Sequence, residues 1–206
     1  AYKTGLSILG LGQLSLTKVM VLVDKGIDVK NRGEVLEQIR KNFDPVDSIM
    51  LISQAPTDTL DFTSKKTHYG NKLVINATTK SESVNLVPPV IPSDLKAIDR
   101  RINKWKLLKN TLLVVSVEKD GSDVVKNIIN SPLISNIKMV AVVSNDIDVN
   151  NDVEVMWGIF TRFDPGDDIY FNKQEFIGAV PKYSGVMGLD ATLSLIHISE
   201  PTRPSS

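Results

Sequence analysis

An internal repeat is the feature that most constrains this chain. The segment FDPVDSI, residues 43–49, returns as FDPGDDI at residues 163–169. Aligning Ile27 with Ile147, an offset of 120 residues, brings residues 18–49 onto 138–169 without a gap. Farther along, INAT (75–78) corresponds to LDAT (189–192) at an offset of 114, so the second copy has a connection six residues shorter. Two copies of one unit predict two related lobes.

Each copy is predicted to form strand, helix and strand. The apolar runs KVMVLV (18–23) and KMVAVV (138–143) are typical of strands buried in a parallel sheet. Apolar side chains then recur at helical spacing. The stripe residues are Val35, Leu36, Ile39 and Phe43 in the first copy and Val155, Met156, Ile159, Phe160 and Phe163 in the second.

The repeated turn is explained first as architecture. Proline lacks an amide N–H and restricts the residue before it, so Asp44-Pro45 and Asp164-Pro165 should end these helices. Each turn is then expected to feed a strand parallel to the first one. The predicted fold class is α/β, with two related βαβ-containing lobes and mainly parallel sheets.

Composition suggests the domain boundaries. We predict a first α/β lobe at residues 1–80 and a second at 107–192. Between them, residues 81–106 combine a proline-rich connector with an amphipathic helix, whose apolar stripe is Leu95, Ile98, Ile102 and Trp105. Residues 193–206 are expected to be a non-native tail, because LSLIHISEPTR resembles a translated adapter used in preparing sequencing libraries.

Charge and composition exclude several classes of function. Lys and Arg number 24 against 24 Asp and Glu, so no bulk field attracts nucleic acid. The absence of cysteine excludes disulfides and thiolate chemistry and fits a reducing cytoplasm, and no apolar run is long enough to predict a membrane span. Without the tail, His68 is the one histidine, so no histidine triad can form. GLGQLS (10–15) lacks a third glycine and precedes its strand, which argues against a dinucleotide loop.

The order of motifs goes further than composition. A TK pair (17–18) opens an apolar strand, and IDV (27–29), NFDP (42–45), TDTLDF (57–62) and NAT (76–78) follow. This order resembles the C-terminal region of UbiD-family decarboxylases, which use prenylated FMN. The second copy carries the pattern again, in IDVNNDVEVMWGIFTRFDPGDDIYF and GVMGLDAT. A doubled C-terminal region is most similar to the longer members associated with menaquinone biosynthesis.

The resemblance implies a carboxy-lyase as the parent protein. Its substrate would be an aromatic acid, such as a hydroxynaphthoate or a polyprenyl hydroxybenzoate of menaquinone or ubiquinone biosynthesis. Prenylated FMN, Mn²⁺ and K⁺ would be bound mostly by an upstream domain, with a flavin prenyltransferase as the cofactor supplier. The resemblance also implies a homo-oligomer, in the cytoplasm or at the membrane periphery.

The same resemblance places the catalytic Arg and paired Glu residues upstream of this chain. We therefore assign it no catalytic residue and no metal ligand, and we expect the chain alone to be inactive. Asp28 and Asp148 are expected to be structural turn residues. The alternative is a non-catalytic assembly or binding module.

Lys18 is the candidate cofactor-binding residue, because the lysine of the matching TK position in this family reaches the cofactor phosphate. Such a contact contributes about 1.5–3 kcal/mol when well placed. The alternative is a solvated lysine at a strand entrance. Lys138 holds the same repeat position but lacks the preceding QLSLT.

Leu60 and Phe62 are candidate walls of the substrate pocket, because the corresponding family segment approaches the substrate. The alternative is that they plug the core of their own lobe, and Asp61 is expected to cap a local turn. In the second copy, helical spacing predicts Phe160 and Phe163 as core residues. Trp157 lies off the main stripe and is a candidate interface residue.

Overall fold

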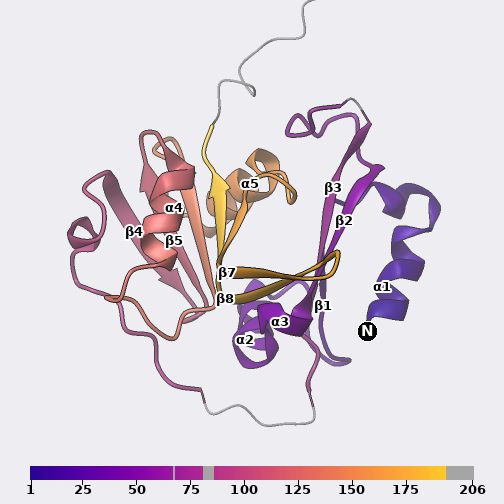
Figure 1. Ribbon diagram of the computed structural model, residues 1–206, viewed down its shortest axis with the longest axis horizontal. Helices are drawn as coiled ribbons and strands as arrows, with labels where there is room; N and C mark the ends of the chain where they lie inside the picture. The colour runs from indigo at the N-terminus through magenta and orange to yellow at the C-terminus, as the bar shows by residue number, and fades with distance from the viewer. Residues whose placement is uncertain (67, 81–85, 194–206) are drawn as a thin grey trace, which may run out of the picture.

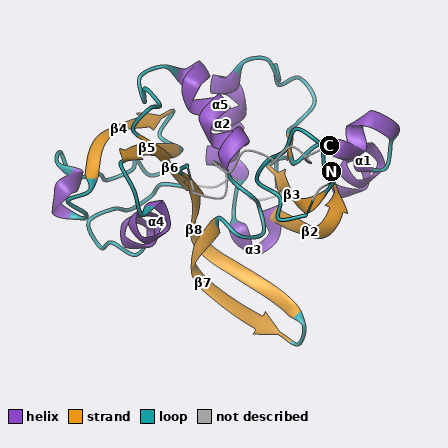
Figure 2. Cartoon of the chain, turned by 90° about the horizontal axis from the view of Figure 1, so that it is seen from above, coloured by secondary structure: helices purple, strands orange, loops and turns teal. Residues whose placement is uncertain are grey.

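The computed structural model describes residues 1–66, 68–80 and 86–193 of this 206-residue chain. Its two sheets lie on opposite sides of the central helices α2 and α5 (Figures 1 and 2). In chain order the elements are α1 (Tyr2–Leu9), β1 (Val19–Leu22), α2 (Arg32–Asn42), α3 (Pro45–Ser48), β2 (Ile49–Pro56), β3 (Tyr69–Asn76), β4 (Ile102–Leu108), β5 (Leu112–Val117), α4 (Gly121–Ile129), β6 (Met139–Ser144), α5 (Asp152–Arg162), β7 (Ile169–Ile177) and β8 (Val180–Ala191), with 3₁₀ turns at Gly12–Leu16 and Leu95–Ala97.

The strands form sheets of order β1-β3-β2 and β4-β5-β6-β8-β7. Parallel ladders join β1 to β3, β5 to β6 and β6 to β8. Antiparallel ladders join β2 to β3, β4 to β5 and β7 to β8. The α/β class is confirmed, and the two kinds of pairing occur equally often among the described strands.

The expectation that each Asp-Pro turn feeds a parallel strand is wrong. The strand after each turn, β2 or β7, runs antiparallel to the strand that follows it in the chain, β3 or β8. It is β3 and β8 that pair in parallel with the first strand of their copy, β1 or β6. The reason is a hairpin that follows each turn. In the second copy only Gly178 and Ala179 separate β7 from β8, and so short a connection can join only antiparallel strands.

One apolar core joins the two copies. It contains Ile39 and Phe43 from the end of α2 together with Ile159 and Phe163 from the end of α5. Strands β3, β5, β6 and β8 cover these side chains, and Phe43 and Phe163 are each only 1% exposed. A second core lies on the other face of the larger sheet, under α4. The copies therefore stabilise each other, because neither buries its helix without the other.

The repeated turn also mediates contact between the copies. Lys138 Nζ, at the entrance to β6, donates to the Phe43 carbonyl at 3.0 Å. Its counterpart Lys18 places Nζ 5.5 Å from the centre of the Phe163 ring. Each lysine thus reaches the Phe of the other copy's turn, as expected for an interface with approximate twofold symmetry.

The acidic turns are structural, as expected. Asn31 caps α2 by accepting from the amides of Gly33 and Glu34, and Glu34 accepts from the Asp28 amide at 3.1 Å. The Asn31 cap satisfies amides that a helix start leaves unpaired, and Glu34 ties the preceding turn to the first turn of the helix. The second copy repeats it with Asn151, Glu154 and Asp148. The Asp28 and Asp148 carboxylates accept from the amides of Lys30 and Asn150 at 2.9 and 3.1 Å, so local turn bonds account for both aspartates.

The amphipathic helix predicted within residues 81–106 is wrong. Leu95–Ala97 forms a 3₁₀ turn, and Ile102 to Leu108 forms strand β4. Pairing with β5 decides the outcome, through a connection of three residues, 109–111, in which Lys109 and Asn110 have φ of 48° and 52°. Two positive φ values belong to the hairpin turn whose twist matches that of its strands.

The proposed domain boundaries remain predictions, since both lobes share one core. Residues 81–85 of the connector and 194–206 of the presumed non-native tail lie outside the described residues. Within the described ranges, no helix is both long enough and apolar enough to cross a bilayer.

Candidate functional site

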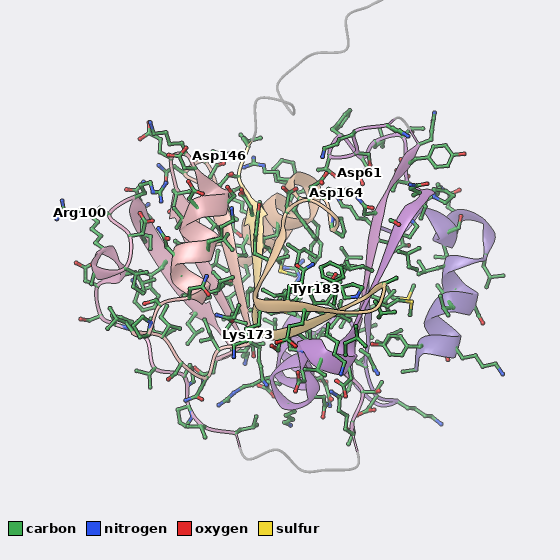
Figure 3. All side chains as sticks on the ribbon, viewed as in Figure 1. Asp61, Arg100, Asp146, Asp164, Lys173 and Tyr183 are labelled. Atoms are coloured by element: carbon green, nitrogen blue, oxygen red, sulfur yellow. The ribbon has the colours of Figure 1, made fainter. Side chains whose placement is uncertain are left out.

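A cavity of about 580 Å³ lies at the junction of the two copies. Figure 3 shows Asp61 and Asp164, which come from opposite copies, on the same side of the molecule. The cavity is lined by Leu16, Lys18, Asp58, Leu60, Asp61 and Phe62 of the first copy and by Trp157, Phe160, Thr161, Arg162 and Leu193 of the second part of the chain. The three predicted site residues, Lys18, Leu60 and Phe62, are therefore brought together.

Lys18 is held by the loop that follows β2. Its Nζ lies 3.1 Å from Asp61 Oδ1 and donates to Thr63 Oγ1 at 3.2 Å. The side chains of Lys18 and Asp61 are only 13% and 9% exposed. Lys18 is thus a largely buried, ion-paired residue and not the solvated lysine of the alternative interpretation.

Asp61 caps its local turn, as expected, and also faces the cavity. Its Oδ1 accepts from the amide and hydroxyl of Thr63 at 3.2 and 2.6 Å. Its Oδ2 is the buried side-chain oxygen that lacks a hydrogen-bond partner within the described part of the chain. An unpaired buried acceptor is costly, so this oxygen favours a donor from a bound group or another part of the protein.

Leu60 and Phe62 project from this loop and do not plug a core. They are 74% and 67% exposed, which rules out the alternative of internal packing within the described structure. Exposed apolar side chains beside a cavity are suited to contacting an apolar ligand or a covering domain.

On the opposite wall of the cavity, which α5 forms, the prediction for Phe160 is wrong. Phe163 is buried as predicted, but Phe160 is 39% exposed and lines the cavity instead of filling the core. The two rings lie 6.3 Å apart, so Phe160 covers the edge of the core. Trp157 is 59% exposed, in agreement with its predicted position off the apolar stripe.

Sequence reasoning missed Arg162, which fixes the shape of this wall. Its guanidinium donates to both carboxylate oxygens of Asp146, at 2.8 and 2.6 Å, and lies 5.5 Å from the Trp157 ring centre. These hydrogen bonds hold the pKa of Asp146 below its usual value. Two such contacts restrain Arg162 and, through it, Trp157.

A comparison of the two copies could have revealed this wall. At the offset of 120, Trp157, Phe160, Thr161 and Arg162 replace Glu37, Arg40, Lys41 and Asn42. The loop carrying Leu60 and Phe62 is replaced by the two residues between β7 and β8. The cavity is therefore built where the repeat departs from symmetry, and departures of this kind indicate function better than the shared motifs do.

The lining residues fit one contact to a phosphate but not a complete phosphate site. A lysine ammonium has three donors, and Lys18 directs two of them to Asp61 and Thr63. The charged residues around the cavity are Lys18, Arg162, Asp58 and Asp61, which carry no net charge. A phosphate dianion would need further cations beyond these lining residues.

Metal binding finds no support in the described residues. They contain no group of three or more His, Cys, Asp or Glu side chains arranged to bind a metal ion. The structure thus gives no reason to assign a Mn²⁺ ligand among the described residues.

A second cavity, of about 290 Å³, lies between the copies. It is almost entirely apolar and includes Val21, Ile39, Leu112 and Ile159 in its lining. Arg32 is the charged residue at its border. Because it lacks paired polar groups, this cavity is less suited than the first to orienting a carboxylate substrate.

Asp168 follows the second Asp-Pro turn and accepts from the Asp164 amide at 2.7 Å. Burial, with a contribution from the Asp190, Asp164 and Asp167 carboxylates, raises the pKa of Asp168 to about 6. A carboxyl whose folded pKa lies above its unfolded value of about 4 binds more protons in the native state between these values. The stability it contributes is complete below about pH 4 and is lost as the pH rises through 6.

Replacing Asp168 by the first copy's residue should remove this pH dependence. The counterpart Ser48 accepts from the Asp44 amide at 3.0 Å without a charge. Between pH 4.5 and pH 7.5, we expect the free energy of unfolding of the wild type to fall by about 1–2 kcal/mol more than that of Asp168→Ser. Urea unfolding of both proteins at both pH values measures this difference. An equal change of stability with pH in the two proteins would contradict this assignment.

Comparison with known proteins identifies the family. The model for the 3-octaprenyl-4-hydroxybenzoate carboxy-lyase C-terminal domain, UbiD_C, matches residues 1–77 and 104–191. The chain therefore belongs to the UbiD C-terminal domain family.

Curated relatives are longer than this chain. A protein of Helicobacter pylori, described as uncharacterized, is 31% identical over 194 residues, which cover 86% of this chain and 30% of the relative. A Chlamydia trachomatis protein with the same description is 26% identical over 199 residues, covering 94% and 32%. The chain thus spans about a third of the length of these relatives.

Solved structures show more limited similarity. An evolved dimeric form of the UbiD-class enzyme HmfF from Pelotomaculum thermopropionicum, in complex with prFMN, is 25% identical with a TM-score of 0.38, covering 53% of this chain and 25% of that one. The 3,4-dihydroxybenzoic acid decarboxylase of Klebsiella pneumoniae is 14% identical with a TM-score of 0.40, covering 54% and 28%. Family membership rests on the family model and not on these alignments.

Proposed function

We propose that this chain is the C-terminal part of a prenylated-FMN-dependent, non-oxidative decarboxylase that acts on an aromatic acid. Hydroxynaphthoates and polyprenyl hydroxybenzoates of quinone biosynthesis are the substrate classes we favour. The observation that carries the proposal is the junction cavity, where Lys18, Leu60 and Phe62 meet the aromatic wall of α5.

In this proposal the chain supplies walls and one cation, and the remainder of the protein supplies the catalytic residues. Lys18 would direct its third proton to the cofactor phosphate, while Asp61 and Thr63 keep the ammonium in place. Leu60, Phe62 and Trp157 would exclude water from the face of an aromatic substrate. Prenylated FMN, when bound, supplies the electrophilic chemistry of decarboxylation.

The test uses the complete protein encoded by the parent gene, produced together with a flavin prenyltransferase. We expect it to retain a prenylated flavin and to release CO₂ from one or more hydroxylated aromatic acids under anaerobic conditions, in the presence of Mn²⁺ and K⁺. The 206-residue chain in the same assay is the control, and we expect no turnover from it. If the complete protein retains no flavin, the proposal is wrong.

Such a failure would favour the alternative, a non-catalytic assembly module. One observation supports an assembly role in either case. The β7–β8 hairpin extends away from the body of the molecule (Figure 2). At its tip, the side chains of Phe176, Ile177 and Val180 are 66%, 58% and 65% exposed. Exposed apolar groups of this kind are common at protein interfaces, so we include a homo-oligomer in the proposal.

A further inference from the structure

The two copies differ in how completely their first strands are covered. In the second copy, β6 lies between β5 and β8, and all of its residues are buried. In the first copy, β1 pairs with β3 alone, and all of its residues are only partly buried. One edge of β1 is thus open within the described structure.

The difference extends to the turn that follows the strand. Val29 and Val149 occupy the same position of the IDV motif, and the same Asn N-cap follows each. Val29 is nevertheless 70% exposed, whereas Val149 is 1% exposed. Because sequence and local backbone agree, the exposure of Val29 reflects a missing neighbour and not a different local structure.

The second copy shows what that neighbour is. The β4–β5 hairpin lies beside the IDV turn, where Lys106 Nζ donates to the Asn150 carbonyl at 3.2 Å and pairs with Asp152 at 2.9 Å. From β5 of this hairpin, Leu112 and Val114 enter the shared core. Leu112 also lines the apolar cavity between the copies, and the first copy offers no described counterpart to it.

The repeat extends farther toward the N-terminus than its motifs do. Helix α4, Gly121–Ile129, falls on residues 1–9 at the offset of 120, and α1 occupies Tyr2–Leu9. Gly5 of α1 faces Leu22 and Met20 of β1, just as α4 packs against the outer face of the larger sheet. The same offset places the counterpart of β5 on the fourth to ninth residues before Ala1.

We propose that the open edge of β1 is the docking site of a β-hairpin from the chain segment that directly precedes Ala1. The second strand of this hairpin pairs parallel to β1, as β5 pairs with β6, and its apolar side chains cover Val19, Val21 and Val29. The first strand corresponds to β4. The relatives are about three times as long as this chain, which leaves ample sequence for such a segment.

The backbone of β1 is arranged to accept this strand. The carbonyls of Lys18 and Leu22 accept from the amides of Leu73 and Ala77 in and next to β3, at 3.0 and 2.8 Å. Because polar groups alternate along a strand, those of the intervening Val19 and Val21 point to the open edge. Unpaired edge groups of this kind favour the addition of a strand.

Amide hydrogen exchange tests the proposal in the complete protein and in the 206-residue chain. We expect the amides of Val19 and Val21 to exchange at least about 100-fold more slowly in the complete protein, whereas β6 amides are protected equally in both. Unprotected Val19 and Val21 amides in the complete protein would overturn the proposal. Protection that already appears in the short chain and rises with its concentration would also overturn it, because a second copy would then be the occupant.

A matched pair of substitutions gives an independent readout. In the 206-residue chain, Val29→Asp should leave the midpoint of thermal unfolding nearly unchanged, whereas Val149→Asp should lower it strongly. In the complete protein, we expect both substitutions to lower the midpoint to a similar extent. If Val29→Asp is tolerated in the complete protein, the hairpin does not cover this face. Neither experiment depends on flavin binding or turnover, so the outcome is separate from that of the proposed function.

Discussion

Phe43→Ala is expected to lower the free energy of unfolding of the whole chain by about 3–5 kcal/mol, the usual cost of truncating a fully buried phenylalanine. Phe43 is 1% exposed and belongs to the core that both copies share. The cost should be apparent as a lower midpoint of urea unfolding, followed by circular dichroism. The effect should not be confined to the first copy, since Phe163 and Ile159 lose the same packing.

Phe160→Ala is the matched control for this substitution. It removes the same number of atoms from a ring that is 39% exposed at the rim of the junction cavity. We expect it to cost at most about 1 kcal/mol, because little new cavity forms inside the core. Equal losses from Phe43→Ala and Phe160→Ala would show that the shared core is not packed as described.

Lys18→Met is expected to have the second large effect, about 3–5 kcal/mol, because it leaves the Asp61 carboxylate buried without its counter-charge. After the loss of Lys18, the Asp61 carboxylate would keep only the neutral amide and hydroxyl donors of Thr63 at Oδ1, while Oδ2 already lacks a partner among the described residues. The double variant Lys18→Met with Asp61→Asn removes the stranded charge. It should recover most of the lost stability, as measured by urea unfolding of the three proteins.

The double variant also separates the structural role of Lys18 from its proposed role in cofactor binding. In the complete protein we expect it to fold but to retain less prenylated flavin than the wild type does. Lys138→Met is the control, because this lysine donates to the Phe43 carbonyl, away from the junction cavity. A double variant with wild-type flavin content would contradict the cofactor role, and no recovery of stability would contradict the buried ion pair.

The repeated elements were the most predictable part of the fold. Strands β1 and β6 and helices α2 and α5 follow from short apolar runs and helical spacing, and the turns at Pro45 and Pro165 end the helices as proline chemistry requires. Their relation in space was not predictable. The contacts of Lys18 with Phe163 and of Lys138 with Phe43 depend on tertiary packing, which no local pattern encodes.

Two errors arise from tertiary context, which local spacing does not encode. Leu95, Ile98, Ile102 and Trp105 have helical spacing, yet pairing with β5 draws Ile102 and Trp105 into strand β4. Tertiary pairing often overrides so short an apolar pattern. Phe160 has core spacing too, but the end of α5 lies at the rim of a cavity, where one side of the ring meets solvent.

The site was predicted in part. Resemblance to the family selected Lys18, Leu60 and Phe62, and the structure places all three around one cavity. On the opposite wall, Trp157 was predicted only as an interface residue and Arg162 was missed, because both positions break the repeat and neither was given a role by the family resemblance.

The central claim is that the two copies form one folded body, with the candidate site at their junction. Tryptophan fluorescence during urea unfolding of Phe43→Ala tests it most directly, because Trp105 and Trp157 both lie in the second part of the chain, whereas the substitution is in the first copy. We predict one transition, shifted equally in tryptophan fluorescence and circular dichroism relative to the wild type. A tryptophan transition that stays at the wild-type midpoint would show that the copies unfold independently, and would contradict the account.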